Sequence, residues 1–226
     1  MRVLGIETST RRGSVALVDG DQVVAHDEEE HPQGHDAHLL AQIERLLQRA
    51  TWSRQSLERV AASVGPGSFT GLRVGLAVAE GLGLALGIQV VGVCSLRAMA
   101  AAVPPGEQRL RCPMLGAGQN QVFTAAYDSS GEERWSPRAL PRGSVLGELR
   151  SALAGHPILV LGETSFGLEA DSVFRSEWTD LPHAVLTARL GARAIWSEAP
   201  IQALYLRPPN AVLPELPPNP LAGNPR

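Results

Sequence analysis

Hydrophobic positions in the first hundred residues follow two alternating periods, one typical of strands and the other typical of helices. Strand-like runs cover 2–7, 13–18, 22–27, 59–64 and 89–93. The second and third runs flank Asp19-Gly20, a dipeptide that favours a tight hairpin turn. From Asp36 to Ala50 the apolar residues recur at helical spacing, and they are Leu39, Leu40, Ile43, Leu46 and Leu47. The pattern predicts a mixed α/β sheet domain.

A second helix is predicted from Thr70 to Leu86, with Gly87 ending it. Its apolar residues surround the helix axis almost completely, so both sides should be covered by other structure. One stripe holds Leu72, Leu76, Ala79, Gly83 and Leu86, and the adjoining stripe holds Gly71, Gly75, Val78 and Leu82. A further helix follows the strand 89–93 and runs through Met99 to Ala102.

Val103-Pro104-Pro105-Gly106 interrupts these patterns and is the expected boundary between two lobes. The predicted division is an N-terminal lobe, 1–103, a smaller C-terminal lobe, 104–207, and a proline-rich tail, 208–226. The second lobe should contain strands at 112–115, 122–127 and 158–161, and helices at 144–154 and 184–198. The tail holds seven prolines and is expected to be extended or disordered.

Composition narrows the class of protein. The 226 residues have 44% hydrophobic content and a net charge of −3, which argues against independent nucleic-acid binding. Cys94 and Cys112 form no disulfide framework, so reduced thiols in a cytoplasmic protein are expected. No signal peptide is evident, and the apolar stretch Leu76 to Val93 is interrupted by Glu80 and Gln89, so no membrane span is expected.

The run from Gly65 to Gly75, GPGSFTGLRVG, joins a short strand to the long second helix. Its glycines and proline favour a tight turn, and Ser68 or Thr70 could cap the helix. Two interpretations remain open for this run. Exposed N–H groups at the helix start could bind a phosphate, or Gly71 and Gly75 could let another backbone approach closely. No lysine follows in the arrangement of a Walker A loop.

Several segments resemble the TsaB (YeaZ) family, a subunit of the bacterial machinery that makes threonylcarbamoyladenosine in tRNA. They are the Gly65–Gly75 run, RVLGIETST at 2–10, GSVAL at 13–17, HDAHLL at 35–40 and ALYLRP at 203–208. The resemblance implies two ribonuclease-H-like lobes of the actin, Hsp70 and sugar-kinase superfamily, the second lobe smaller and degenerate.

The resemblance also implies a partner subunit without catalytic residues of its own. It would pair with a TsaD-type catalytic subunit, and through that subunit with a TsaE-type ATPase, while tRNA is contacted mainly by the complex. The implied interface residues are Gly71, Leu72, Gly75, Leu76, Val78, Ala79, Leu82, His38 and Gln42. Without the partner, the same patch should favour a homodimer. Gly75→Leu is then expected to weaken assembly and leave the fold intact.

Candidate chemistry at the end of the first strand centres on Glu7, Ser9 and Thr10, with Gly65 and Gly67 of the glycine turn. In kinases and ATPases of the implied superfamily, an acidic residue there helps to hold a metal–nucleotide complex. The alternative is a polar strand end whose hydroxyls fix the turn. No cofactor of its own is expected, although ATP or ADP with Mg²⁺ at the subunit junction fits the resemblance.

A metal site is not expected. His35 and His38 lie three residues apart, with His26 and His31 nearby, but no acidic or sulfur ligand is placed beside them. The catalytic relative TsaD carries a His-x-x-x-His metal motif after a Gly-Val strand end, where this chain has Ser95 and Met99. Gly116 and Gly118 also replace charged residues of the family pattern. An autonomous nucleotide phosphohydrolase or kinase is the alternative function, and a protease is a third, without an evident nucleophile–base pair.

Overall fold

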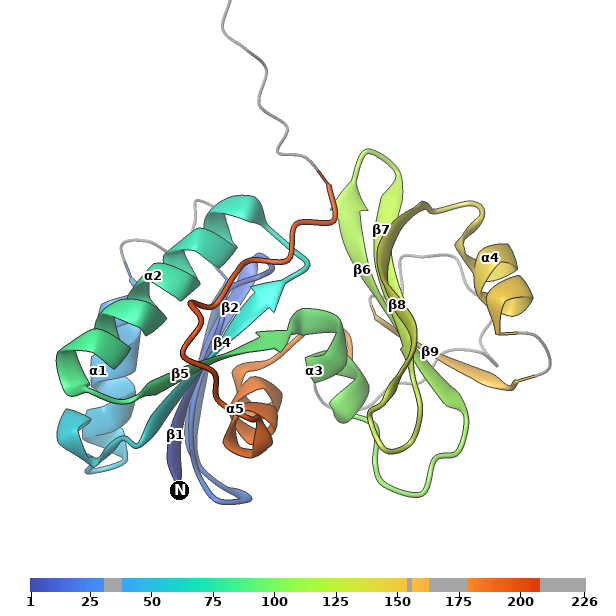
Figure 1. The fold of residues 1–226 in the computed structure, drawn as a ribbon. Coiled ribbons are helices and arrows are strands. Elements are labelled where there is room, and N and C mark those ends of the chain that lie inside the picture. Colours follow the sequence, from blue (N-terminus) through green and yellow to red (C-terminus); the bar gives the residue numbers. More distant parts are fainter. Residues whose placement is uncertain (31–37, 154–155, 163–178, 208–226) are drawn as a thin grey trace, which may run out of the picture.

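The computed structural model describes residues 1–30, 38–153, 156–162 and 179–207, which fold into two lobes, each built on its own sheet (Figure 1). His31 and His35 and the predicted tail, 208–226, lie outside the described residues. The two-lobed α/β architecture expected from the sequence is confirmed.

The first lobe holds a five-stranded sheet in the order β3-β2-β1-β4-β5. The strands are β1 (Arg2–Glu7), β2 (Arg12–Asp19), β3 (Gln22–Glu30), β4 (Arg59–Gly65) and β5 (Gln89–Cys94). The first three form an antiparallel meander, and β4 and β5 run parallel to β1. All five strand predictions are therefore confirmed. The bounds of β1 are those predicted, and the other four strands are longer than predicted by one to three residues at one or both ends.

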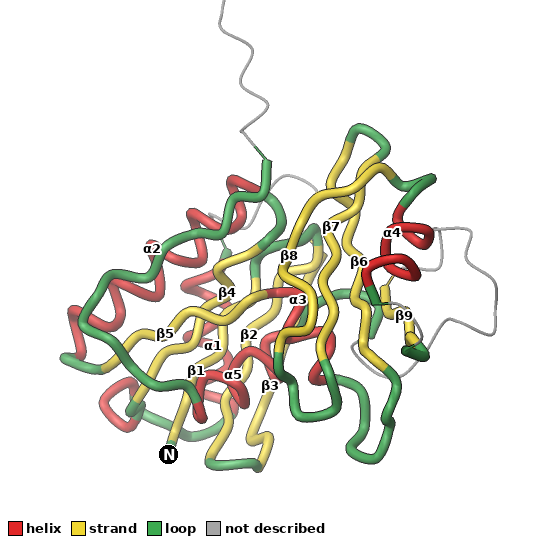
Figure 2. The backbone as a smooth tube through the Cα atoms, turned by 45° about the vertical axis from the view of Figure 1, so that its right-hand side comes forward, coloured by secondary structure: helices red, strands yellow, loops and turns green. Residues whose placement is uncertain are grey.

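Helices cover both faces of this sheet (Figure 2). α1 (Leu39–Arg49) and α2 (Phe69–Leu86) pack with the side chains of Leu4 and Ile6 on one face. α5 (Ala184–Arg193) packs with Val3 and Ala61 on the opposite face. Neighbouring residues of β1 thus enter different cores, as the twofold period of a strand requires. α3 (Ser95–Ala101) follows β5 directly and lies between the lobes (Figure 1).

The second lobe holds a four-stranded sheet in the order β8-β7-β6-β9. The strands are β6 (Leu110–Gly118), β7 (Gln121–Tyr127), β8 (Glu133–Pro141) and β9 (Ile158–Gly162), with α4 (Val145–Ala152) beside them. Strand β8 was not predicted, because its sequence, ERWSPRALP, is polar and contains two prolines. It is an edge strand, where such residues are tolerated.

The predicted assignment of all residues from 104 to 207 to the second lobe is wrong for α5. This helix belongs to the first lobe, since it packs on β1, β2 and β4. It also ends at Arg193, whereas the prediction continued it to Glu198. The amphipathic pattern identified α5 as a helix but could not say which sheet its apolar face would cover. A Cβ on Gly5 would overlap the Ala184 carbonyl, so the small residue in β1 lets α5 lie close to the sheet.

Helix α2 alone, among the described residues, is long and apolar enough to cross a bilayer by length and composition. Its inner side, however, is part of the first core through Leu72, Leu76 and Ala79. Its C-terminus is closed by Gly87 at φ 67°, the left-handed conformation expected of a C-cap glycine. These contacts identify α2 as a helix of the globular fold that leaves one side exposed.

Candidate functional site

The glycine-rich run before α2 packs inside the first lobe. The Ser68 amide donates to the Ser9 carbonyl at 2.7 Å, and a Cβ on Gly67 would overlap that carbonyl. The Ser68 hydroxyl accepts from the Gly71 amide at 3.2 Å, so the predicted N-cap is confirmed for Ser68. The run therefore packs against the turn after β1. This contact agrees with the interpretation that the glycines let another backbone approach closely.

The packing partner is nevertheless different from the one expected. Gly71 and Gly75 face Thr8, and a Cβ on either glycine would overlap an oxygen of that residue. The Thr8 hydroxyl donates to the Gly71 carbonyl at 2.8 Å. The expectation that these glycines stay open for a partner helix is therefore wrong, because strand β1 of the same chain fills the space. Leu72, Leu76 and Ala79 are also buried, and so they cannot form an external interface in this fold.

Other residues of α2 form the exposed apolar side of the helix. They are Ala77, Gly81, Leu84 and Ala85, flanked by the half-buried Val74, Val78 and Leu82. Leu84 is 88% exposed, and Leu40 on the neighbouring helix α1 is 59% exposed. Among the nine predicted interface residues, Val78, Leu82 and His38 are accessible, whereas Gln42 is buried and donates to Asp27 Oδ2 at 3.2 Å. We use the name α1–α2 face for the exposed and half-buried apolar residues of α2 named above, together with Leu40 and Ala41 of α1.

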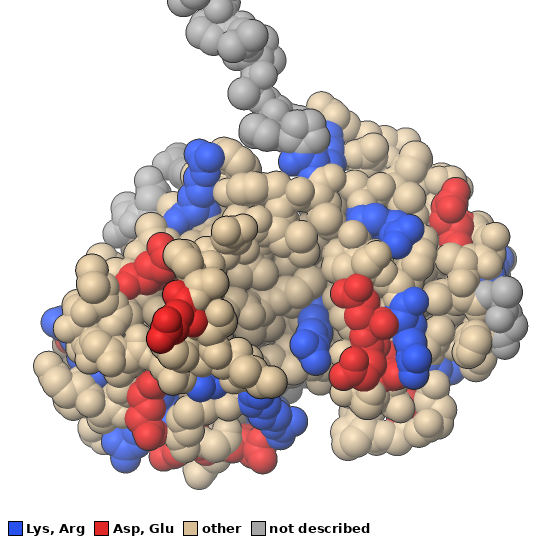
Figure 3. Space-filling view, viewed as in Figure 1, with Lys and Arg blue, Asp and Glu red and all other residues tan. Residues whose placement is uncertain are grey.

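A groove runs along this face between the two helices. It has a volume of about 500 Å³ and is bounded at one end by the short 3₁₀ turn Arg54–Ser56. Its apolar lining comes from both helices: Leu40, Ala41, Ile43 and Leu47 of α1, and Leu82, Ala85 and Leu86 of α2. Figure 3 shows few charged side chains over α2, in contrast to the lower edge of the molecule.

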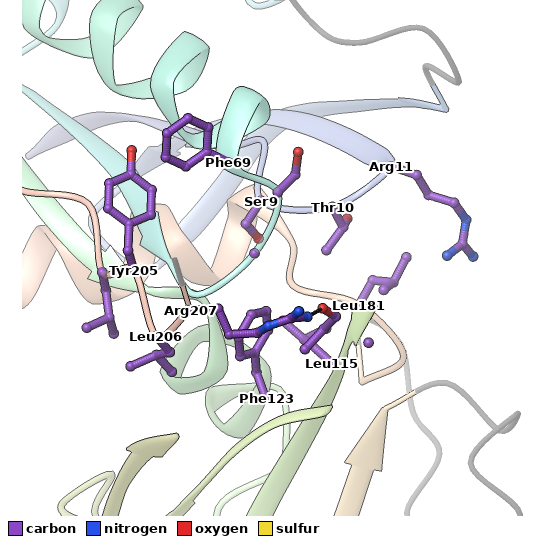
Figure 4. A pocket seen from close by; sticks show the side chains of 15 residues that line it. Ser9, Thr10, Arg11, Phe69, Leu115, Phe123, Leu181, Tyr205, Leu206 and Arg207 are labelled. Carbon is purple, nitrogen blue, oxygen red and sulfur yellow. Dashed lines mark hydrogen bonds between the residues drawn. The ribbon is translucent and has the colours of Figure 1, made fainter. Parts of the chain in front are cut away.

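A second hollow, the inter-lobe cleft, lies at the carboxyl end of β1, where the superfamily resemblance predicted a nucleotide. Its volume is about 370 Å³, and Ser9, Thr10 and Gly67 line it together with Arg11 and Ser68 (Figure 4). The structure thus brings together three of the five predicted nucleotide-binding residues. Gly65, at φ 105°, does not line the cleft, because it packs against Leu72 and the Leu204 carbonyl.

Glu7 does not face this cleft. Its side chain is fully buried, and its carboxylate accepts from the Ser9 amide at 2.8 Å and from the Thr187 hydroxyl at 3.4 Å. Burial raises the pKa of the Glu7 carboxyl, and the hydrogen bonds from Ser9 oppose that rise. The Glu7 carboxyl thus links the end of β1 to the turn after it, through Ser9, and to α5, through Thr187.

The segment after α5 crosses the first lobe and reaches the cleft (Figure 1). We call residues 201–207 the strap. The Leu204 amide donates to the Val64 carbonyl at 2.6 Å, and the Tyr205 ring packs on Phe69 with centroids 4.9 Å apart. Arg207 donates to the carbonyl groups of Ala117 and Gly118 in the β6–β7 hairpin. The strap therefore closes one side of the cleft and joins the two lobes.

Comparisons with known proteins agree with this geometry. A family model described as TsaD, tRNA N6-adenosine threonylcarbamoyltransferase, matches residues 25–139. The tRNA threonylcarbamoyladenosine biosynthesis protein TsaB of Escherichia coli K12 is 30% identical over 165 residues, covering 71% of each chain. Its counterpart in Bacillus subtilis is 31% identical over 127 residues, covering 56% of this chain and 55% of that protein. The chain belongs to the TsaB family.

Solved structures show the same fold. A Pseudomonas aeruginosa protein described as similar to the peptidase YeaZ matches with a TM-score of 0.68 at 25% identity, covering 91% of this chain and 99% of that chain. YeaZ from the same organism matches with a TM-score of 0.63 at 23% identity, covering 85% and 91%. The predicted two-lobed α/β fold is confirmed, and it is the fold of these YeaZ structures.

In this TsaB-family chain, Ser95 and Met99 stand at the start and middle of α3, and both are fully buried. His38 lies on the surface at the start of α1. Among the described residues, no group of three histidine, cysteine, aspartate or glutamate side chains is placed to hold a metal ion. Met99 belongs to the buried cluster that joins α3 to the second lobe through Leu115 and Phe123.

Sequence reasoning missed Leu84, Leu40 and the strap residues Tyr205 and Arg207. Leu84 carried no readable signal, because the apolar residues of α2 surround the helix axis almost completely, and Leu40 lay within the apolar pattern of α1. The strap carried none beyond its resemblance to the family, since an irregular segment has no hydrophobic period. Its contacts depend on the position of the C-terminus of α5, from which the strap continues.

Proposed function

We propose that this chain is a non-catalytic partner subunit of a tRNA threonylcarbamoyladenosine synthesis complex. In that complex, a metal-binding TsaD-type subunit transfers the threonylcarbamoyl group from threonylcarbamoyl-AMP to N6 of the adenosine next to the anticodon. The observation that carries the proposal is the α1–α2 face, with Leu84 and Leu40 exposed beside an apolar groove. Exposed leucines that are clustered rather than scattered mark an interaction surface.

The chemistry of the face favours two partner helices as its occupant. The groove of about 500 Å³ is deep enough to receive side chains, and its floor is formed by aliphatic residues of both helices. Covering two helix faces would bury roughly 1,600 Å² in total, which is the size of a standard protein interface. The half-buried Val78 and Leu82 would form its centre. A second copy of the chain would cover the same face when the partner is absent.

The absence of catalysis rests on the residues at the start of α3. A serine hydroxyl and a methionine thioether, both buried at Ser95 and Met99, cannot replace two imidazoles at a catalytic metal site. The partner would therefore supply the metal and the transfer chemistry. This chain would hold the partner in its active arrangement, in the cytoplasm where tRNA is modified, while a TsaE-type ATPase acts on the complex.

ATP or ADP with Mg²⁺ is better placed at the subunit junction than in the inter-lobe cleft of this chain. The Glu7 carboxylate is buried and occupied by Ser9 and Thr187, so it cannot reach a metal–nucleotide complex in this fold. The strap also occupies one side of the cleft through Tyr205 and Arg207. These contacts favour an accessory subunit over the alternative of an autonomous phosphohydrolase or kinase.

Reconstitution of the modification tests the proposal. The TsaD-type and TsaE-type proteins of the same genome are combined with threonylcarbamoyl-AMP and unmodified tRNA, with and without this chain. We expect modified adenosine to form only when the chain is present, and we expect the chain alone to hydrolyse no ATP. Full modification without the chain, or ATP turnover by the isolated chain, would reject the proposal.

A further inference from the structure

A third hollow, which we call the arginine cavity, lies between the lobes, beside α3 and α5. It has a volume of about 460 Å³ and is enclosed by α3, α5, the β2–β3 turn and the β7–β8 turn. Four guanidinium groups and one carboxylate line it among the described residues: those of Arg97, Arg111, Arg189, Arg193 and Asp21. In Figure 3, basic side chains border the lower end of the hollow between the lobes.

Arg111, on β6, is the group that most needs an explanation. It is only 5% exposed, and its one hydrogen bond to a described residue is a long one, from Nη2 to the Pro104 carbonyl at 3.4 Å. Its Nε is buried without a partner. The nearby carboxylates of Glu107 and Asp128 are engaged by other arginines, at 2.8 Å in each case. A buried charge with neither a carboxylate nor a full set of acceptors is costly, so an anionic ligand would stabilise it.

The two arginines of α5 lie one turn apart and share a single acidic neighbour. Arg193 pairs with the Asp21 carboxylate at 2.5 Å, and Arg189 donates to the Asp21 backbone carbonyl at 3.1 Å. The Arg189 Nε is also buried without a partner. Arg97, on α3, is exposed at the mouth of the cavity. The lining of the cavity thus holds four guanidinium groups and one carboxylate, in a protein whose net charge is −3.

The residue type itself carries little information, because the chain contains no lysine and all 20 of its basic residues are arginines. The convergence of four on one cavity is the informative feature. Arginine forks bind phosphate and carboxylate oxygens through paired hydrogen bonds, and several positive charges favour a ligand with several negative ones. A volume of about 460 Å³ lies within the range of small-molecule sites.

We propose that the arginine cavity binds a small ligand through a diphosphate or triphosphate group, with Arg111 at its base and Arg97 at its mouth. The exposed turn residues Ser129 and Ser130 stand at the rim, where their polar groups would face the rest of the ligand. A nucleic-acid backbone fits less well, because it needs an extended basic surface and this chain is acidic overall. The site is separate from the inter-lobe cleft and from the α1–α2 face, so it does not depend on the proposed function.

Calorimetry of the full chain with sodium triphosphate, at low salt, tests this site. The variants are Arg111→Gln and Arg97→Gln, and the matched control is Arg150→Gln, an exposed arginine on α4 outside the cavity. We expect the wild type to bind triphosphate more tightly than inorganic phosphate. Each cavity variant should weaken binding by about tenfold or more, as expected for a lost charge-assisted contact, while the control changes it less than about twofold.

Circular dichroism confirms that each variant is folded, and if Arg111→Gln is not, Arg97→Gln and Arg189→Gln decide the outcome. Equal weakening by Arg150→Gln would show general charge attraction and overturn the proposal. The same conclusion would follow if triphosphate bound no better than phosphate, or if unmodified tRNA bound in an Arg111-dependent way while triphosphate did not.

Discussion

A side chain on Gly75 would overlap the hydroxyl of Thr8, the same hydroxyl that donates to the Gly71 carbonyl at 2.8 Å. Because of this contact between α2 and the end of β1, Gly71 and Gly75 of the glycine-rich run face the interior of the first lobe. The glycines fix how closely the helix lies on the sheet, and the helix then presents its opposite side, with Leu84, to solvent. The glycines thus set the position of the α1–α2 face without being part of it.

The first prediction concerns Gly75→Ala. A methyl group must displace the buried Thr8 side chain, and overpacking of this kind typically costs about 1–3 kcal/mol of the free energy of unfolding. Gly81→Ala is the matched control on the same helix, because nothing lies within 4 Å of a Cβ there. That change should stabilise the fold by roughly 0.5–1 kcal/mol, since alanine favours helix over glycine. Urea unfolding measures both, and equal effects at the two positions would contradict the packing described.

The second prediction concerns Glu7→Gln. Burial raises the pKa of Glu7 above its ordinary value of 4.5, so the folded chain holds this proton more tightly than the unfolded chain does. That contribution to stability is complete below pH 4.5 and is lost as the pH rises through the folded pKa. The glutamine variant keeps a neutral side chain at every pH.

Urea unfolding of wild type and Glu7→Gln between pH 4 and pH 8 checks this expectation. The stability of the variant relative to wild type should increase as the pH rises. A difference that stays constant over this range would mean that the Glu7 carboxyl titrates normally, and the nucleotide–metal role would then return as an explanation for it.

The third prediction concerns His183, which caps the N-terminus of α5. Its Nδ1 accepts from the Val185 amide at 3.1 Å, so the folded state needs this nitrogen unprotonated. Burial lowers the pKa of His183 from 6.5 to about 3, and the positive charge of nearby groups adds to the effect. Its contribution to stability is therefore complete above pH 6.5 and is lost as the pH falls towards 3.

His183→Asn should keep the cap, because the asparagine oxygen can accept from the same amide, while removing the titration. Between pH 6 and pH 4 the wild type should lose up to about 1.4 kcal/mol per pH unit relative to the variant. Unfolding curves at each pH measure the difference. Parallel acid destabilisation of the two proteins would show that another group is responsible.

Most of the first lobe could be predicted from the sequence, because its strands and helices carry clear hydrophobic periods. The hairpin turn at Asp19-Gly20 and the helix end at Gly87 also follow from the conformational preferences of those residues. The position of α5 could not be predicted, since two sheets compete for its apolar face and only the three-dimensional path of the chain decides between them.

The residues of the α1–α2 face were predicted less well than the helices and strands, because the hydrophobic pattern of α2 is ambiguous. The apolar residues of α2 surround the helix axis almost completely, so the sequence does not say which side of the helix faces the sheet. Gly71 and Gly75 face inward because Thr8 approaches them. Leu84 faces outward as a consequence, although leucine is the more hydrophobic residue.

The most direct test of the account is the affinity of this chain for the TsaD-type subunit of the same genome. Leu84→Asp and Leu40→Asp change the α1–α2 face, and Ile195→Asp is the matched control, an apolar residue that is 98% exposed elsewhere. The account predicts that each of these two face variants weakens binding by about thirtyfold, or roughly 2 kcal/mol, while the control binds like wild type. Undiminished binding by both face variants, each correctly folded, would contradict it.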